Sequence, residues 1–359
     1  MKSKKILGLF GAVALAIVLT LAFVPGCAEE APAPAPAPAP EAMEPQQWDM
    51  ITYEVTLEVP REQIWLKATQ RIKERTNGLL DIRYVPAGAL PIKPEDWLRA
   101  VSKGDLAICN AVVGYAAGDY PSLEIVELPF VYTNTLEREI AWNAVFPIYQ
   151  RELAKENLQI LSLYETGTST LAVNKPVDLM DLKGLKIRTY GTTIPKMVET
   201  MGGVAAPLAL SETYSALEKG VVDGVLTGTT SIYSAGLHKL APYFYDIGWI
   251  MDPSPWIVNK ELWDALPKEI QNIVYEELGM ACSTTTLKAH IEIDEMWEQM
   301  LAEVAGKGCD KVEVAPPGFA DMMREKVTKP MVAEQLVKNG ALGEELITAL
   351  EEALGISLR

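Results

Sequence analysis

The side chains best suited to chemistry in this 359-residue sequence are hydroxyl, amide and aromatic groups placed around one arginine. Arg188 ends a strand-like segment, 185–189, and precedes Tyr190-Gly191-Thr192-Thr193, which leads into a helix. A guanidinium in that position can hold a carboxylate through two hydrogen bonds, beside the free N–H groups of a helix start. The pattern alone equally allows a structural ion pair with Asp181 or Glu212.

Other candidate binding residues follow from topology. Open α/β sheets bind ligands beyond the carboxyl ends of their strands, a rule that selects Asn110, Tyr115, Thr168, Ser169 and Thr227. These groups favour holding a small molecule over transforming it.

Two aromatic residues complete the candidate set. Tyr214 lies on a helix that Ser211 is expected to cap, and Trp249 follows the aromatic run 243–245. Both carry a polar atom that is useful in a binding cleft, although aromatic residues at such spacing are also common in cores.

Several function classes are excluded by what the sequence lacks. It holds two histidines and four cysteines without a C-x-x-C pair, and it has no P-loop, G-x-G-x-x-G or H-E-x-x-H motif and no visible nucleophile–base pair. The sequence therefore predicts no metal, no cofactor and no enzymatic activity. The formal charge of −16 disfavours nucleic acid as a partner.

The segments that would position these residues alternate between strand and helix patterns. Strands are expected at 53–59, 80–85 and 106–109 with helices at 60–76 and 94–103. A second series has strands at 158–164, 185–189 and 221–226 and a helix at 194–201. This order predicts an α/β fold of two similar halves, each built on a parallel sheet covered by helices.

The stretch 267–306 predicts one long helix. It contains no internal proline and only one glycine before Gly306, and apolar residues recur at helical spacing. A helix of this length would cross both halves. The alternative is a break near 283–286, where three threonines follow a serine.

The N-terminus predicts export and anchoring. Three lysines precede an apolar run that ends at Val24-Pro25-Gly26-Cys27, so we assign residues 1–26 to a signal peptide and Cys27 to lipidation. An uncleaved membrane anchor is the alternative. The Ala/Pro-rich segment 27–49 is expected to be an extended linker.

The three remaining cysteines are not expected to form a disulfide. Cys109 lies in an apolar run and is predicted to be buried, whereas Cys282 and Cys309 would be far apart along the long helix.

Several ordered motifs resemble those of the solute-binding proteins of tripartite ATP-independent periplasmic (TRAP) transporters. They are 184–188 (GLKIR), 211–217 (SETYSAL) and 220–224 (GVVDG), with further likeness at 77–80, 86–88, 128–130 and 259–263.

The resemblance implies a two-lobed, periplasmic-binding-protein-like fold with a long helix spanning both lobes. We assign 50–164 plus 253–292 to the first lobe and 165–252 plus 293–359 to the second. Arg188 matches the family's carboxylate-binding arginine and Tyr214 matches its motif tyrosine. The chain departs from sialic-acid-binding members at Gly167-Thr168-Ser169, and from the metal-using branch at Leu226-Thr227.

The sequence therefore predicts a lipid-anchored receptor on the outer face of the cytoplasmic membrane or in the periplasm. It would capture a small organic acid and deliver it to TRAP membrane permease subunits. The alternatives are a receptor for an ATP-driven importer, a sensor, or a surface hydrolase.

Overall fold

The computed structural model describes residues 43–359, except Thr166, residues 251–252 and residues 308–310. The predicted signal peptide, the lipidation residue Cys27 and most of the Ala/Pro linker lie outside the described residues, as does Cys309. Within the described residues, the chain forms two mixed sheets with helices packed against them.

The first sheet has the strand order β2-β1-β3-β10-β4. β1 pairs in parallel with β2 and β3, whereas β10 runs antiparallel to β3 and β4. The expectation of a purely parallel sheet is therefore wrong, because β10 returns from the second half of the chain. The strands are β1 (Gln46–Ile51), β2 (Leu80–Val85), β3 (Ile108–Asn110), β4 (Leu158–Glu165) and β10 (Pro253–Asn259).

The second sheet has the strand order β11-β9-β5-β8-β6-β7. β6 pairs in parallel with β7 and β8, and β5 runs antiparallel to β8 and β9, so this sheet is mixed as well. Its strands are β5 (Thr168–Val173), β6 (Lys186–Thr189), β7 (Val204–Pro207), β8 (Gly224–Gly228), β9 (Tyr243–Ile250) and β11 (Glu313–Val314).

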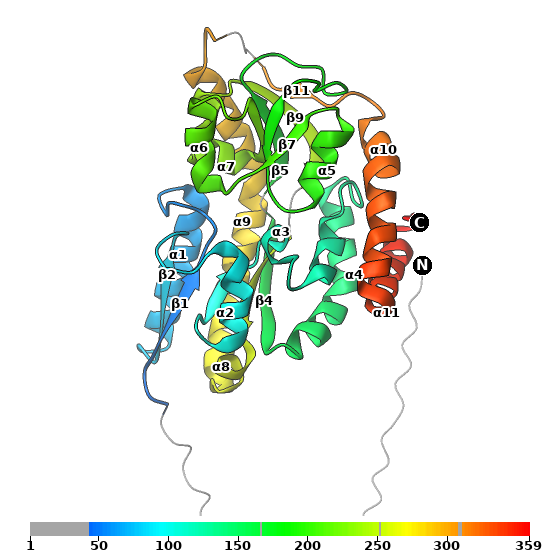
Figure 1. Ribbon diagram of the computed structural model, residues 1–359. Helices are drawn as coiled ribbons and strands as arrows, with labels where there is room; N and C mark the ends of the chain where they lie inside the picture. The colour runs from blue at the N-terminus through cyan, green and yellow to red at the C-terminus, as the bar shows by residue number, and fades with distance from the viewer. Residues whose placement is uncertain (1–42, 166, 251–252, 308–310) are drawn as a thin grey trace, which may run out of the picture. The chain divides into compact units, whose positions relative to one another are not determined.

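Helices surround both sheets (Figure 1). The α-helices are α1 (Pro60–Arg75), α2 (Trp97–Lys103), α3 (Val113–Ala116), α4 (Thr135–Ala154), α5 (Thr193–Thr200), α6 (Leu210–Glu218), α7 (Thr229–Ser234), α8 (Lys260–Asp264), α9 (Lys268–Glu303), α10 (Phe319–Met323) and α11 (Lys329–Leu354). Shorter helical turns are η1 (Pro94–Asp96), η2 (Pro121–Glu127), η3 (Leu237–Lys239) and η4 (Arg324–Thr328).

The single long helix is confirmed. α9 runs unbroken through Ser283 and the threonines that follow, over 36 residues, which at 1.5 Å per residue is about 54 Å. Its first half packs with α1 and β4 beside the first sheet, and its second half contacts α7 beside the second sheet. Ile270 and Met300 consequently belong to two different buried clusters, and Figure 1 shows the helix passing both sheets.

The predicted strand at 53–59 is wrong. The strand lies earlier, at β1, and begins inside the segment assigned to the linker. The alternation that indicated a strand is inverted in the structure, because Glu54 is buried while Val55 is 39% exposed. Thr52 and the carbonyl of Glu54 instead hydrogen-bond to the chain leaving β2, at Val85 and Ala87.

Two further sequence expectations have clear outcomes. Cys109 is fully buried, as predicted, and Cys282 is a free, half-buried thiol. Ser211 is not the helix cap: α6 begins at Leu210 with Ala209 as its N-cap, and Glu212 accepts a hydrogen bond from the Ala209 N–H at 3.3 Å.

Apart from the start of β1 and the last residue of β4, the strands of each sheet come from one of the ranges 50–164 plus 253–292 and 165–252 plus 293–359. This division stays a prediction of lobe boundaries. The C-terminal helix α11 belongs by sequence to the second of these ranges but packs against elements of the first. α11 lies along α4 and η2, which come from the first of these ranges (Figure 1).

Candidate functional site

A cavity of about 360 Å³ lies between loops that leave the two sheets. This volume falls at the lower end of the range for small-molecule sites. From the first sheet and its connections, the lining comprises Tyr53, Val55, Arg61, residues 87–88 and 90–94, Val112 and Tyr115; from the second it comprises Arg188, Tyr190 and residues 209–211, 227–228 and 230–231.

Arg188 brings a buried, incompletely paired cation to this cavity. The residue is 1% exposed, and its Nε donates to the Leu208 carbonyl at 2.9 Å. Its Nη1 and Nη2 have no hydrogen-bond acceptor among the described residues. Because buried charges are normally paired, two unused donors on a guanidinium point to an anionic partner that arrives from outside.

The surroundings of Arg188 act on its pKa in opposite directions. Burial lowers the pKa of the guanidinium, and the phenols of Tyr115 and Tyr190 partly oppose that effect. The Tyr190 ring also lies under the guanidinium, with 5.2 Å from Cζ to the ring centroid. Arginine remains a cation at neutral pH under such conditions, since its guanidinium is effectively always protonated in proteins.

The alternative of a structural ion pair for Arg188 is wrong. Asp181 accepts a hydrogen bond from the Lys183 N–H at 3.1 Å, and Glu212 is used at the start of α6. No carboxylate in the described part of the chain lies within salt-bridge distance of Arg188.

β6 is fixed against β8 by the pair Asp223-Gly224. The Asp223 carboxylate accepts a hydrogen bond from the Lys186 N–H at 2.9 Å. A Cβ on Gly224 would lie 2.6 Å from the Ala172 carbonyl oxygen, so only glycine allows β8 to approach β5 this closely. The two residues thereby fix the position of β6, the strand that carries Arg188.

The loop after Arg188 is held by the buried Glu124 of η2. Thr192 donates to one carboxylate oxygen of Glu124, and Gln335 of α11 donates to the other at 2.9 Å. Lys338 adds an ion pair at 3.3 Å. The C-terminal helix therefore supports the segment that ends in the binding arginine.

A second arginine in the cavity lining is already compensated. Arg61 is 4% exposed; its Nη2 lies 2.5 Å from Glu54 and its Nε 3.1 Å from Glu62. Burial lowers the pKa of Arg61, but Tyr53 and the two carboxylates outweigh it and raise the pKa well above its ordinary value. Tyr84 donates to Glu62.

Glu54 also connects the two halves of the site. Ser234, the last residue of α7, donates to its carboxylate at 3.2 Å. Burial raises the pKa of Glu54, with Glu62 acting in the same direction and Arg61 against it. The cluster of Glu54, Arg61 and Glu62 thus reaches from the first sheet to a helix of the second.

Three of the residues selected from the sequence line the cavity: Arg188, Tyr115 and Thr227. Tyr115 follows β3 and lies with its ring centroid 5.8 Å from that of Tyr190. Thr227 is in β8, two residues beyond the partner of Arg188 in the strand register.

The other five are not in the cavity lining. Asn110 and Ser169 are fully buried, and their side chains have no hydrogen-bond partner among the described residues. The Thr168 carbonyl accepts from the Thr229 hydroxyl at 3.1 Å. Tyr214 is 40% exposed on α6.

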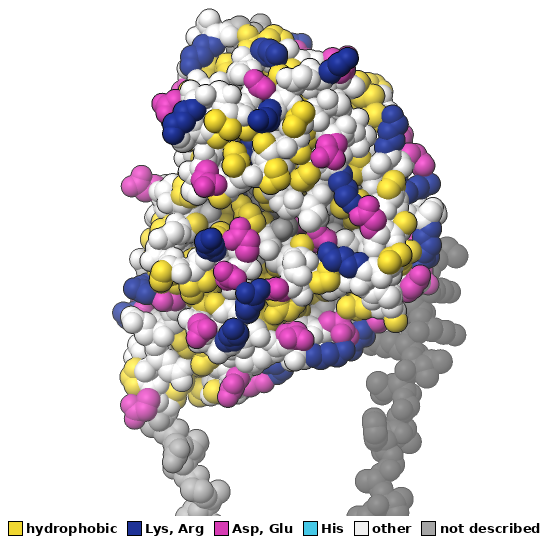
Figure 2. Space-filling view, viewed as in Figure 1, with side chains coloured by type: hydrophobic (Ala, Val, Ile, Leu, Met, Phe, Trp, Pro, Cys, Tyr) yellow, Lys and Arg dark blue, Asp and Glu magenta, His cyan; other side chains and the backbone are white. Residues whose placement is uncertain are grey.

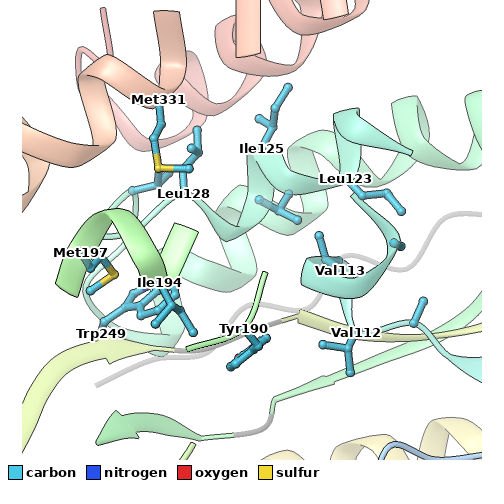
Figure 3. Packing of buried hydrophobic residues seen from close by; sticks show 14 of the residues in the cluster. Val112, Val113, Leu123, Ile125, Leu128, Tyr190, Ile194, Met197, Trp249 and Met331 are labelled. Carbon is cyan, nitrogen blue, oxygen red and sulfur yellow. The ribbon is translucent and has the colours of Figure 1, made fainter. Parts of the chain in front are cut away.

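Trp249 is a core residue. It is 2% exposed and belongs to the same buried cluster as Ile194 and Met197 of α5, beside which Figure 3 places it. The core alternative given for these aromatic residues therefore describes Trp249 better than a lining role.

Sequence reasoning missed Arg61, Tyr190 and the loop 86–94. The loop was detectable, because it follows a predicted strand at the edge of the sheet where ligands bind and contains Pro86 and Gly88. Tyr190 lies two residues after Arg188. Arg61 gave no signal, since it falls at the start of a helix, where arginines are ordinarily solvated.

Charged side chains of both signs are scattered over the face seen in Figure 2, without a large patch of one sign. Within the described residues no group of three or more His, Cys, Asp or Glu side chains is placed to hold a metal ion. None of the helices in that part of the chain combines the length and apolar character needed to cross a bilayer.

Comparison with known proteins places the chain in a family. Residues 54–339 match the model of the bacterial extracellular solute-binding proteins, family 7. A solute-binding protein of Chromohalobacter salexigens is 26% identical over 211 residues, 58% of this chain and 62% of that protein, so the match spans less than two thirds of that relative. The ectoine-binding periplasmic protein TeaA of Halomonas elongata is 24% identical over 70% of this chain and 75% of its own.

A solved structure agrees with this assignment. DctP7 of Bordetella pertussis, an extracytoplasmic solute receptor binding pyroglutamic acid, superposes with a TM-score of 0.76 at 25% identity, covering 85% of this chain and 99% of its own. The family match covers most of the chain, and the fold is that of a two-lobed TRAP receptor. The chain therefore belongs to the family 7 bacterial extracellular solute-binding proteins, the receptors of TRAP transporters.

Proposed function

We propose that this protein is the receptor of a TRAP transporter and that it binds a small organic acid in the cavity between its two sheets, with Arg188 holding the carboxylate. The observation that carries the proposal is the pair of buried Arg188 nitrogens, Nη1 and Nη2, without acceptors in the described part of the chain. A bidentate carboxylate supplies two acceptors in the geometry of a guanidinium.

Arg188 is held ready for this role before the ligand arrives. Its Nε is already bonded to the Leu208 carbonyl, and its planar group lies over Tyr190. The binding orientation therefore costs little further side-chain entropy, which is the usual advantage of a preorganised site.

Hydroxyl groups near the end of β8 complete the polar part of the site. Thr227, Thr230 and Ser231 line the cavity and are less than 10% exposed. They supply donors and acceptors for further ligand oxygens. Tyr115, on the other wall, lies beside the guanidinium and borders the same end of the cavity.

Because the walls come from both sheets, a bound ligand would connect them. The chain passes between the sheets at β4–β5, at β9–β10 and along α9. A ligand that contacts both walls would stabilise a closed arrangement, and the closed form is what the membrane subunits would recognise. This is how receptor binding would be coupled to delivery.

We further propose that the receptor works on the outer side of the cytoplasmic membrane. The signal-like residues 1–26 and the following Cys27 favour export with a lipid anchor, and the Ala/Pro segment would separate the binding unit from the membrane. Labelling with radioactive palmitate, followed by Cys27→Ala, tests the anchor: the label should be lost in the variant.

The binding function is tested by titrating the full-length protein with organic acids and with their uncharged amides, following tryptophan fluorescence. At least one acid should bind saturably while its amide binds at least 100-fold more weakly, because only the acid supplies an anion for Arg188. Equal binding of an acid and its amide would contradict the proposal, as would the absence of any binding across sugar acids, dicarboxylates, amino acids and apolar acids.

A further inference from the structure

The cavity's charges and walls narrow the class of ligand. We infer that the site takes a monocarboxylate whose remaining part is apolar, and that it discriminates against dicarboxylates and polyhydroxylated acids. This inference rests on the proposed function, since it concerns the ligand held by Arg188.

The number of carboxylates follows from the charges that line the cavity. Arg188 has two unused donors, so it accommodates one carboxylate. Arg61, the other arginine in the lining, lies against both Glu54 and Glu62. With Glu54 ionised the cluster carries a net charge of −1, and with Glu54 protonated it is neutral. In either state it offers no excess positive charge to a second ligand carboxylate.

Lys93 is the remaining cation in the lining, and it is exposed to solvent. Water and salt screen an exposed ammonium, so its attraction for a ligand anion is weak compared with that of a buried guanidinium. A second ligand carboxylate would consequently lose its hydrogen bonds to water and find no buried cation to replace them. The site is therefore built for a single negative charge.

The walls away from Arg188 are mostly apolar. Val55, Leu90, Ile92 and Val112 come from the first sheet's side, and Leu210 comes from the start of α6. The buried serine and threonine hydroxyls of the lining come from the end of β8 and the start of α7, on the same side as Arg188. A ligand hydroxyl facing the apolar walls would lose its water partners without replacement.

Against the same walls, an apolar ligand body would gain binding free energy. It would cover half-buried leucine and isoleucine side chains that otherwise face water in the cavity, and burial of apolar surface is favourable in proportion to its area. The volume of about 360 Å³ leaves room for such a body beyond the carboxylate.

The inference is tested by ranking four probes on the full-length protein by calorimetry. Phenylacetate and 4-methylpentanoate represent apolar monocarboxylates, succinate the dicarboxylates and D-glucuronate the hydroxylated acids. At least one apolar acid should bind tenfold or more tightly than succinate and glucuronate. Tighter binding of succinate or glucuronate would overturn the inference while leaving the proposed function intact. If no organic acid binds at all, both fail.

Wall variants sharpen the test. Ile92→Asn should weaken the tightest apolar acid about tenfold, whereas Leu136→Asn, at an exposed position of α4 outside the cavity lining, should leave its affinity unchanged. Thermal unfolding of both variants checks that the fold is retained. Lys93→Gln supplies the opposite outcome: if it weakens the tightest probe tenfold while Ile92→Asn does not, an exposed second charge is the anchor and the inference is wrong.

Discussion

Replacing Arg188 by lysine should reduce ligand affinity about 100-fold without unfolding the protein. The guanidinium uses Nε for the Leu208 carbonyl and keeps Nη1 and Nη2 for a carboxylate. A lysine ammonium is a single point that cannot serve both partners in this fixed geometry. The loss of one to two charge-assisted hydrogen bonds, each about 1.5–3 kcal/mol, amounts to about 3 kcal/mol, or roughly 100-fold.

The assay compares dissociation constants and ligand-dependent unfolding. At a ligand concentration about 100 times the wild-type Kd, binding stabilises the wild type by about 2.7 kcal/mol, but a variant with 100-fold weaker affinity gains only about 0.4 kcal/mol. That difference corresponds to several degrees in Tm. Calorimetry at the same concentrations gives the Kd values directly.

A matched control is Arg83→Lys. Arg83 is 57% exposed in its side chain and pairs with Asp49 on the surface of β1 and β2, so its replacement should leave ligand affinity unchanged. If Arg188→Lys keeps its affinity within twofold of the wild type, Arg188 does not hold the carboxylate. If both variants lose affinity equally, the loss does not arise from the geometry of the Arg188 site, because each substitution keeps the positive charge.

Three other substitutions probe the scaffold. Gly224→Ala should lower the free energy of unfolding by about 1–3 kcal/mol, because its Cβ would meet the Ala172 carbonyl. Gly279→Ala, inside α9 and with no neighbour within 4 Å of the new Cβ, should raise it by about 1 kcal/mol. Urea titration measures both, and the same sign for the two would refute the packing argument. Glu277 is buried on α9; burial raises its pKa, but Arg71 and Arg75 lower the pKa overall. The ionised carboxylate therefore stabilises the fold above the ordinary pKa of 4.5, and this stabilisation is lost as the pH falls below it. Glu277→Gln should therefore destabilise by about 1–2 kcal/mol at neutral pH, since both arginines are partly solvated, and by much less near pH 3; an equal gap at the two pH values would contradict this assignment.

The sequence was most informative where local pattern and tertiary structure agree. The predicted helices at 60–76 and 194–201 correspond to α1 and α5, and the predicted long helix corresponds to α9. In each, apolar spacing and start or stop residues indicate the same element.

The failures have specific physical causes. β10 was not predicted because Pro253 and Pro255 lie in it, and proline is rare within sheets; the structure nevertheless places β10 between β3 and β4. α11 contains Gly340 with a backbone conformation outside the helical region, which interrupts any helical pattern. The segment after β1 was mistaken for a strand because its alternation indicates outward-facing polar residues, whereas Glu54 is buried against Arg61 and Val55 is exposed.

Part of the candidate site was predictable from the sequence, because topology selects residues at the ends of strands. Arg188 and Thr227 lie at or near the carboxyl ends of parallel strands, where topology alone selects them. Tyr214 and Trp249 were selected by residue type, and type does not determine whether an aromatic side chain faces solvent, core or cavity. One is half-exposed on α6, and the other is buried among α5 side chains.

The two arginines of the cavity show why neighbours, and not residue type, decide which of them binds. Arg61 is surrounded by carboxylates that the chain itself supplies, so its burial is compensated in the unliganded protein. Arg188 has one carbonyl and an aromatic ring, and a buried cation without a counter-charge costs several kcal/mol of folding free energy. That cost is returned only when an anion binds, so the same feature that weakens the empty protein makes ligand binding favourable. An internal acid beside Arg188 would stabilise the fold and abolish the site, which is why the pairing seen at Arg61 is absent at Arg188 among the described residues.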